Sequence, residues 1–405
     1  MVGEYLIRLL IFILLQCLGL CVHASIDLDS AYPDLDEQFI GKVHFTYGTF
    51  NNANGKKTDT FLGRVTNAVW DAPNFSLVSN TKISDNIYFR GSAEAVILDS
   101  QSNNITPTIQ SYGVDIILSK FGVVSLGLLP GPTRQMLSFT ELESGVRAYA
   151  FEDVADIEAI DRHTNASLGY YRDGAHFGPV GGTGYRPMLR YMLPLTSFEL
   201  MVALGGDQVT ITEGSIKYIY DGSFARWVSM LGFASDMPDQ ATTHVIGVTG
   251  PAYPTYKGYR YIENAGKLSV GFVDWIYSYS WLNTKQNKPS ASHWFTGLDY
   301  TFLDFSTYGP LTLGVGFFQQ KHGSLDLKPF PVATSAAIPV VDVKSKGWIF
   351  ALNKKFGNAG IRTFFERFST QSSKSGNPTK FHSKPIYALG ITMYYDFISR
   401  VSQDG

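Results

Sequence analysis

Residues 386–397, IYALGITMYYDF, decide the fold class. Every second position carries a large apolar side chain: Tyr387, Leu389, Ile391, Met393, Tyr395 and Phe397. The positions between them carry mostly small or polar side chains, among them Ala388, Gly390, Thr392 and Asp396. Because successive side chains of a β-strand point to opposite faces, this stretch predicts a strand with one apolar and one wettable face. That division is typical of transmembrane β-barrels, whose strands face lipid on one side and a polar interior on the other.

The same alternation recurs along the chain. Segment 270–281 sets five large apolar side chains against Asp274, Ser278 and Ser280, and segments 86–97 and 41–48 repeat the pattern. Fourteen further segments are comparable: 59–70, 110–119, 121–129, 165–173, 185–193, 197–204, 208–220, 223–233, 242–249, 257–263, 293–305, 310–319, 346–354 and 360–369. Some of these eighteen segments will lie in loops. The sequence therefore predicts an all-β, transmembrane antiparallel barrel of about sixteen strands.

Composition supports strands and argues against several other classes of protein. Charged residues make up 17% of the chain, below the soluble average of about 25%, and aromatic residues make up 14%. Aromatic side chains favour pleated sheets, and the 39 glycines disfavour helices. A net charge of −2 does not suit a nucleic-acid partner. No stretch after residue 24 holds 18 uncharged apolar residues, so transmembrane helices are not expected.

A soluble β-sandwich, β-helix or propeller is the alternative interpretation of the alternation. A soluble sheet that sets Trp, Tyr and Phe opposite Ser and Asp would need cover on both faces. The sequence contains no propeller or β-helix repeat period. The barrel is the preferred interpretation for these reasons.

The N-terminus predicts export. One basic residue, Arg8, precedes an apolar run at 9–22, and small residues at Val22 and Ala24 suit cleavage after Ala24. The run is about 14 residues, short of the roughly 20 that span a bilayer as a helix. The only cysteines, Cys17 and Cys21, lie inside this segment, so the mature chain has neither a disulfide nor a thiolate metal site. We expect a signal peptide at 1–24, a periplasmic leader at 25–38, a barrel at 39–397 and a tail at 398–405.

Two stretches carry a resemblance to a known family. The first is Ser111-Tyr112-Gly113-Val114-Asp115 through Lys120-Phe121-Gly122-Val123-Val124-Ser125-Leu126-Gly127. The second is Asp161-Arg162-His163-Thr164-Asn165-Ala166-Ser167-Leu168-Gly169-Tyr170-Tyr171, followed by Phe177-Gly178. They resemble, in the expected order, two segments of the general, trimeric porins of Gram-negative bacteria. The strand at 41–48 and the terminal strand ending at Phe397 are similar to the two ends of that family.

The resemblance implies a sixteen-stranded homotrimeric barrel of the bacterial outer membrane that passes ions and small hydrophilic solutes by diffusion. It implies no enzyme activity and no cofactor, and outer-membrane lipid or lipopolysaccharide as a neighbour. A substrate-specific transport barrel, or an adhesin or structural barrel acting through its external loops, remains an alternative. Two departures from the family pattern stand out. Leu128 occupies the place of an arginine, and residues 398–405 follow the terminal aromatic Phe397.

The resemblance also implies that the third external loop, at about 130–164, folds inward and constricts the pore. This stretch is rich in acidic residues: Glu141, Glu143, Glu152, Asp153, Asp156, Glu158 and Asp161. Basic residues expected to face the lumen opposite the loop are Lys42, Arg64, Arg90, Arg186 and Arg190. Arg162 is added because it matches the family's basic position just after the constriction loop. Acidic and basic walls that face each other would set up a transverse field favouring polar solutes.

Overall fold

The computed structural model describes eighteen stretches of the chain. They are 37–51, 58–62, 74–84, 86–99, 105–119, 121–133, 135, 139–146, 156–161, 167–172, 185–205, 211–237, 259–284, 291–302, 309–327, 338–374, 380–382 and 386–401. The expected signal peptide and most of the expected leader lie outside the described residues. Among the residues that are described, no helix is long and apolar enough to cross a membrane.

The described part of the chain contains twenty β-strands. They are β1 (Glu37–Asn51), β2 (Thr58–Leu62), β3 (Asn74–Ser84), β4 (Ile87–Asp99), β5 (Ile105–Leu118), β6 (Gly122–Pro130), β7 (Asp156–Asp161), β8 (Ser167–Arg172), β9 (Tyr185–Pro194), β10 (Phe198–Gly205), β11 (Ile211–Asp221), β12 (Ala225–Met237), β13 (Tyr259–Val270), β14 (Val273–Thr284), β15 (Ala291–Phe302), β16 (Leu311–Leu327), β17 (Ile338–Phe356), β18 (Ala359–Lys374), β19 (Lys380–His382) and β20 (Ile386–Val401).

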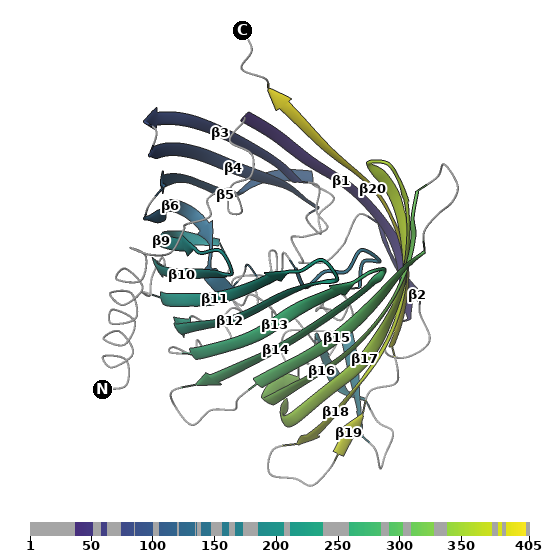
Figure 1. Cartoon of the computed structure of the whole chain (residues 1–405). Coiled ribbons are helices and arrows are strands. Elements are labelled where there is room, and N and C mark those ends of the chain that lie inside the picture. Colours follow the sequence, from purple (N-terminus) through teal and green to yellow (C-terminus); the bar gives the residue numbers. More distant parts are fainter. Residues whose placement is uncertain are drawn as a thin grey trace.

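Sixteen of these twenty strands pair into a closed antiparallel ring (Figure 1). The order is β1, β3, β4, β5, β6, then β9 through β18, then β20, which pairs again with β1. The closing ladder runs from Glu37 opposite Val401 to Phe50 opposite Ala388. The prediction of an all-β antiparallel barrel of about sixteen strands is confirmed. Residues 398–401, expected to be part of a separate tail, extend the last strand and take part in this closure.

The other four described strands are not part of the ring. Strand β2 pairs with β1, β7 forms a hairpin with β8, and the short β19 pairs with both β18 and β7. The strand predicted at 165–173 is therefore present as β8 but is not a strand of the barrel wall. Strand β3, which no predicted segment covered, takes a place in the wall between β1 and β4.

The connections define two different rims. Short turns at 195–197, 222–224, 271–272 and 357–358 lie at one edge, which we call the short-turn rim. The strand ends that border the longer intervals 131–184, 238–258, 328–337 and 375–385 lie at the other edge, the long-loop rim. The two-residue turns at the short-turn rim need a left-handed residue, and Gly271 and Gly357 supply it with φ of 57° and 64°. Transmembrane barrels have short periplasmic turns and longer external loops.

The two faces of the wall follow the alternation seen in the sequence. On β20, Leu389, Ile391 and Met393 are exposed on the outer face, whereas Gly390 and Thr392 are buried on the inner face. Aromatic side chains gather on the outer face at two levels. Trp227, Trp275 and Tyr277 contact one another near the short-turn rim, and a second layer, further along the strands toward the long-loop rim, contains Trp294, Phe317, Trp348 and Tyr387. Such girdles mark the two interfaces of a membrane-embedded barrel.

Candidate functional site: the barrel interior

Charged side chains line the inner face of the wall. They alternate with the outward apolar positions on strand after strand: Arg90, Glu94, Asp115, Arg190, Glu199, Glu213, Lys217, Glu263, Lys267, Asp274, Asp299, Lys355, Arg362 and Glu366. Several of them form pairs across neighbouring strands. The Lys217 ammonium lies 2.7 Å from the Glu199 carboxylate, and Lys267 lies 3.0 Å from Asp274. An inner face with this much charge requires water or polar partners close by.

A segment after β6 runs along the inner wall. Pro130 ends β6, and its carbonyl oxygen accepts a hydrogen bond from Nη1 of Arg190 at 3.4 Å. Three residues later, the Thr133 hydroxyl donates to the Glu213 carboxylate on β11 at 3.2 Å. Thr133 also lies against Gly232 on β12, where the absent side chain leaves room for it. Residues 131–133 therefore follow the inside of the barrel away from β6.

Residues 141–146, which we call the loop tip, dock on the inner face of β15 to β18. The backbone N–H and the hydroxyl of Ser144 both donate to the Asp299 carboxylate, at 2.7 and 2.5 Å. Asn353 on β17 donates its amide N–H to the Glu143 carbonyl oxygen at 2.9 Å. Leu142 and Val146 are fully buried on either side of this contact. The loop tip is thus held by polar bonds at its centre and by apolar packing at its edges.

Glycines on β15 and β16 form the surface on which the loop tip docks, here called the glycine seat. A Cβ atom at Gly297 would contact Leu142, one at Gly316 would contact Val146, and one at Gly314 would overlap the Ser144 hydroxyl. These inner positions admit the loop backbone only because they lack side chains. The tip itself turns at Gly145, whose φ of 95° suits glycine, and the Leu142 N–H bonds to the Val146 carbonyl.

Two ion pairs connect the loop tip to the wall. Arg362 on β18 lies 3.1 Å from Glu141, and Lys355 on β17 lies 3.6 Å from Glu143. The Arg362 guanidinium also lies 4.8 Å from the ring centroid of Tyr394, whose hydroxyl donates to Asn353. The sequence-based list of basic residues did not include Lys355 or Arg362. Arg362 lies on the predicted strand at 360–369, and Lys355 directly follows the predicted strand at 346–354, so alternation could have placed both on the inner face.

The loop tip docks on the side of the barrel opposite its origin. Strand β16 lies eight strands from β6 in either direction around the sixteen-stranded ring. The contacts fall at Asp299, Asn353 and Arg362, each three residues from the end of its strand nearest the short-turn rim. At 3.3 Å per residue, this is about 10 Å along the strand from that rim. The described residues between Pro130 and Val146 therefore begin on the inner wall near β6 and end on the far wall of the interior.

The predicted acidic residues fall into three groups. Glu141 and Glu143 are placed at the loop tip with the partners given above. Only the backbone is described for Asp156, Glu158 and Asp161, which lie on β7. Asp161 is opposite Phe381 of β19 in the ladder that joins these two strands. Glu152 and Asp153 lie outside the described residues.

The predicted basic residues are placed in part. Arg90 and Arg190 lie on the inner face, and Arg190 contacts Asp115 at 4.0 Å and the Ser125 hydroxyl at 3.3 Å. Lys42 and Arg186 are described by backbone only, in β1 and β9. Arg64 and Arg162 lie outside the described residues.

The position of Leu128 bears on the first departure from the family pattern. Leu128 lies opposite Tyr112 and Pro187 in its two ladders, and both of these residues are exposed on the outer face. Position 128 therefore belongs to the outer face, and a leucine there removes no charge from the inner wall of this barrel.

The fold defined by this ring is that of the outer-membrane porins. OmpT of Vibrio cholerae superimposes with a TM-score of 0.56 at 11% identity, over 89% of this chain and 99% of that one. The anion-selective porin of Comamonas acidovorans gives 0.56 at 12% identity, over 89% and 99%. The outer membrane channel DcaP of Acinetobacter baumannii gives 0.55 at 11% identity, over 89% and 97%.

Comparison of the sequence itself gives no such relatives. No family model matches the chain, and no curated protein matches it. Within the described residues, no group of three or more His, Cys, Asp or Glu side chains could hold a metal ion.

Proposed function

We propose that this chain is an outer-membrane porin that lets ions and small hydrophilic solutes cross the bacterial outer membrane by passive diffusion. One observation carries the proposal: a closed ring of sixteen strands has an apolar outer face and a charged inner face. The outer face suits lipid, and the inner face suits water and polar solutes. The porin fold of OmpT and of the anion-selective porin supports the same function.

The stretch at 130–164 is the proposed constriction. Its first part, through Val146, docks across the interior and so reduces the cross-section left for solutes. Glu141 and Glu143 are held by Arg362 and Lys355, so the acidic side of the constriction would come chiefly from Glu152, Asp153, Asp156 and Glu158. Arg90 and Arg190, with Lys42, Arg64, Arg162 and Arg186, would supply the basic side. Opposed charges in a narrow, low-dielectric passage favour polar over apolar solutes.

Assembly as a homotrimer in the outer membrane, after removal of a signal peptide at 1–24, belongs to the same proposal. The solved structure of OmpT is described as a trimer form, which supports this assembly by analogy. The outward apolar belt, bounded by aromatic side chains at two levels, supports insertion into a bilayer.

Recording from planar bilayers tests the proposal. The purified protein should insert as channels whose conductance rises in groups of three steps. A variant with Glu152→Gln, Asp153→Asn, Asp156→Asn and Glu158→Gln should shift the reversal potential toward anion selectivity, because the acidic side is lost. Asp221→Asn is the matched control: its side chain is 72% exposed at the short-turn rim and pairs with Arg226. No conductance at all would refute the channel, and an unchanged reversal potential in the quadruple variant would refute the placement of the constriction.

A further inference from the structure

The outer face of β16 and β17 carries an unusual set of positive charges. Lys321 on β16 lies directly opposite Lys344 on β17, and Lys346 is the next outward residue along β17. All three side chains are exposed. Like charges directly opposite each other destabilise a pair of strands. An arrangement of this kind is expected where an anion from outside the chain compensates the repulsion.

The described part of the chain supplies no such anion. Among these residues, no ion pair or hydrogen bond joins Lys321, Lys344 or Lys346 to a carboxylate. The residue opposite Lys346 on β16 is Gln319, which is neutral. A fourth cation, Arg367 on β18, is opposite Trp348, which is two residues from Lys346 in the direction of the short-turn rim. Its guanidinium lies 5.9 Å from the ring centroid of Tyr387. The four side chains form a patch, here called the basic patch, on three neighbouring strands.

The basic patch lies just beyond an aromatic layer. Phe317 is opposite Trp348 in the ladder, one outward position below Gln319 and Lys346. Trp348 contacts Phe350 and Phe365, at centroid distances of 4.4 and 6.2 Å. Tryptophan and tyrosine belts sit at the level of the lipid headgroups. The three lysines are therefore at headgroup level in the leaflet on the side of the long-loop rim.

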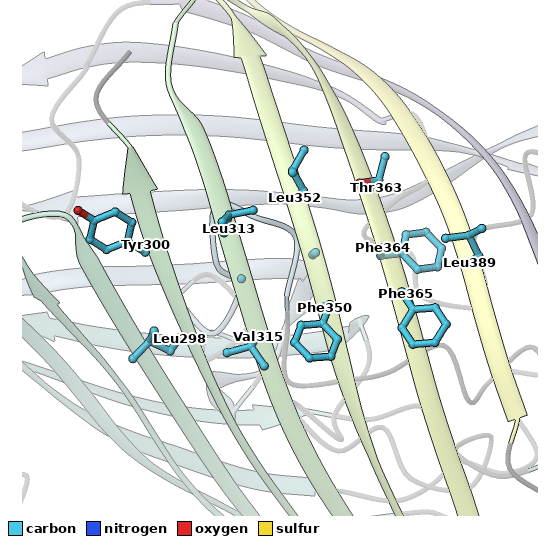
Figure 2. A pocket seen from close by; sticks show the side chains of 12 residues that line it. Leu298, Tyr300, Leu313, Val315, Phe350, Leu352, Thr363, Phe364, Phe365 and Leu389 are labelled. Atoms are coloured by element: carbon cyan, nitrogen blue, oxygen red, sulfur yellow. The ribbon is translucent and has the colours of Figure 1, made fainter. Parts of the chain in front are cut away.

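An apolar groove continues below the aromatic layer on the same strands (Figure 2). Its volume is about 490 Å³. Figure 2 shows the side chains of Leu298, Leu313, Val315, Phe350 and Leu389 around it on the outer face of the wall. From Val315 to Lys321 is six residues, about 20 Å along the strand. Strands tilted by about 40° convert this to about 15 Å of depth, half the hydrocarbon core of a bilayer.

We propose that this face of β16 to β18 binds one anionic lipid with a phosphate-bearing headgroup. The phosphate lies among Lys321, Lys344 and Lys346, and an acyl chain runs past Trp348 into the groove at Val315 and Phe350. A free phosphate ion would account for the lysines but not for the groove one leaflet deep beneath them. The same four positive charges disfavour a second copy of this chain that presents the same face. The proposal rests on the membrane-inserted barrel of the proposed function.

Titration of the full-length protein in an uncharged detergent tests the lipid site. The probes are lipid A carrying both phosphates, lipid A with its phosphates removed, and inorganic phosphate, with binding followed by native mass spectrometry. Phosphorylated lipid A should bind to the native protein more tightly than the dephosphorylated form. The triple variant Lys321→Gln, Lys344→Gln and Lys346→Gln should bind it less tightly by about fivefold per lysine removed, the effect expected for one cation near a charged lipid surface.

Lys354→Gln is the matched control. Lys354 lies on the outer face of the same strand but close to the short-turn rim, where its ammonium donates to the Gly309 carbonyl oxygen. This variant should bind lipid A as the native protein does. Val315→Trp, which fills the groove, should weaken lipid A binding without changing that of a short-chain phospholipid.

Three results would overturn the proposal. The first is equal affinity of the triple variant and the native protein for phosphorylated lipid A. The second is displacement of the lipid by inorganic phosphate at a comparable concentration, which would indicate an ion site. The third is a change in oligomeric state of the triple variant with lipid binding intact, which would make the patch an interface between copies. Conductance of the same samples in neutral bilayers separates this test from the channel proposal. Channels that form without preferential binding of phosphorylated lipid A refute only the lipid site. Preferential binding of phosphorylated lipid A by a protein that forms no channels refutes only the porin.

Discussion

The inner wall of the barrel differs between β15–β18 and β4. On β15 the side chains of Phe295 and Asp299 are at most 1% exposed, and the loop tip packs on that strand. On β4 the inner side chains of Arg90, Ser92 and Glu94 remain half-buried. The first wall is covered by the chain's own loop, whereas the inner side chains of β4, the strand here called the open wall, keep part of their surface exposed.

The residue types explain the difference. The covered wall places Gly297, Gly314 and Gly316 where backbone and side chains of the loop tip must approach closely. The open wall places Arg90 and Glu94 at equivalent inward positions. A glycine seat admits a docked segment, and a charged side chain keeps its hydration only where nothing docks. One β-barrel therefore carries a wall that holds the loop tip and a strand, β4, whose charged inner side chains stay partly exposed.

Gly314→Ala should have the largest effect on this division. A Cβ atom at this position would overlap the Ser144 hydroxyl and the Asp299 carboxylate, so the loop tip could not dock as it does. Overpacking of this kind costs about 1–3 kcal/mol. Release of the tip should enlarge the passage and raise the single-channel conductance in planar bilayers.

Gly91→Ala is the control for that variant. A Cβ atom at Gly91 would meet nothing within 4 Å, and the residue lies on the outer face of the open wall. Its conductance should equal that of the native protein. An unchanged conductance in Gly314→Ala would mean that the loop tip does not limit the passage.

Ser144→Ala should loosen the loop tip without undocking it. The variant keeps the backbone N–H bond to Asp299 but loses the hydroxyl bond to the same carboxylate. A hydrogen bond to a charged group contributes about 1.5–3 kcal/mol. Hydrogen exchange at residues 141–146 should accelerate accordingly. Ser111→Ala is the control, because it removes a 3.4 Å hydrogen bond to Glu94 on the open wall. It should change the free energy of local opening, measured by hydrogen exchange, by no more than about 0.5 kcal/mol. Equal effects of the two variants would contradict the contrast between the walls.

The sequence predicted the barrel because alternation survives wherever one face meets lipid. Strand β3 shows why some strands were not predicted. Its stretch NFSLVSNTKIS has the exposed Leu77 beside the buried Val78, and then polar residues on both faces, so no clear two-residue period appears. Register with β1 and β4, rather than its own pattern, gives this segment its place in the wall.

The site was predictable only in outline. The acidic character of 130–164 could be recognised in the sequence, but the partners of Glu141 and Glu143 could not. Alternation assigns Lys355 and Arg362 to the inner face without stating which strands the loop will reach. That depends on the path of the loop across the ring, which follows from the glycine seat on β15 and β16 and from closure by β1 and β20. Of the six predicted basic residues, Arg90 and Arg190 are placed on the inner face, and these two remain candidates for the solute-facing side.

A double-mutant cycle on Glu141 and Arg362 should give a smaller effect. The two side chains are 36% and 19% exposed, so water screens the pair in part, and a coupling of about 0.2–1 kcal/mol is expected. Hydrogen exchange of the loop tip in Glu141→Gln, Arg362→Gln and the double variant would give this coupling. The pair Asp221 and Arg226, at 3.8 Å and more than half exposed, is the comparison and should show none. If the coupling between Glu141 and Arg362 is as small as that of the comparison pair, this ion pair does not help to hold the loop tip in place.

Arg90→Gln should have the smallest effect, on selectivity rather than on structure. Arg90 lies on the open wall opposite Asp115 in the ladder, so its charge contributes to the potential that passing ions meet. Loss of that charge should shift the reversal potential slightly toward cations and leave loop-tip exchange unchanged. Arg367→Gln removes an arginine from the outer face, on the lipid side of the wall, and should leave the reversal potential as it is. If both variants shift selectivity equally, the inner position of Arg90 has no special access to the ion path, and the open wall on β4 does not face the permeating solutes.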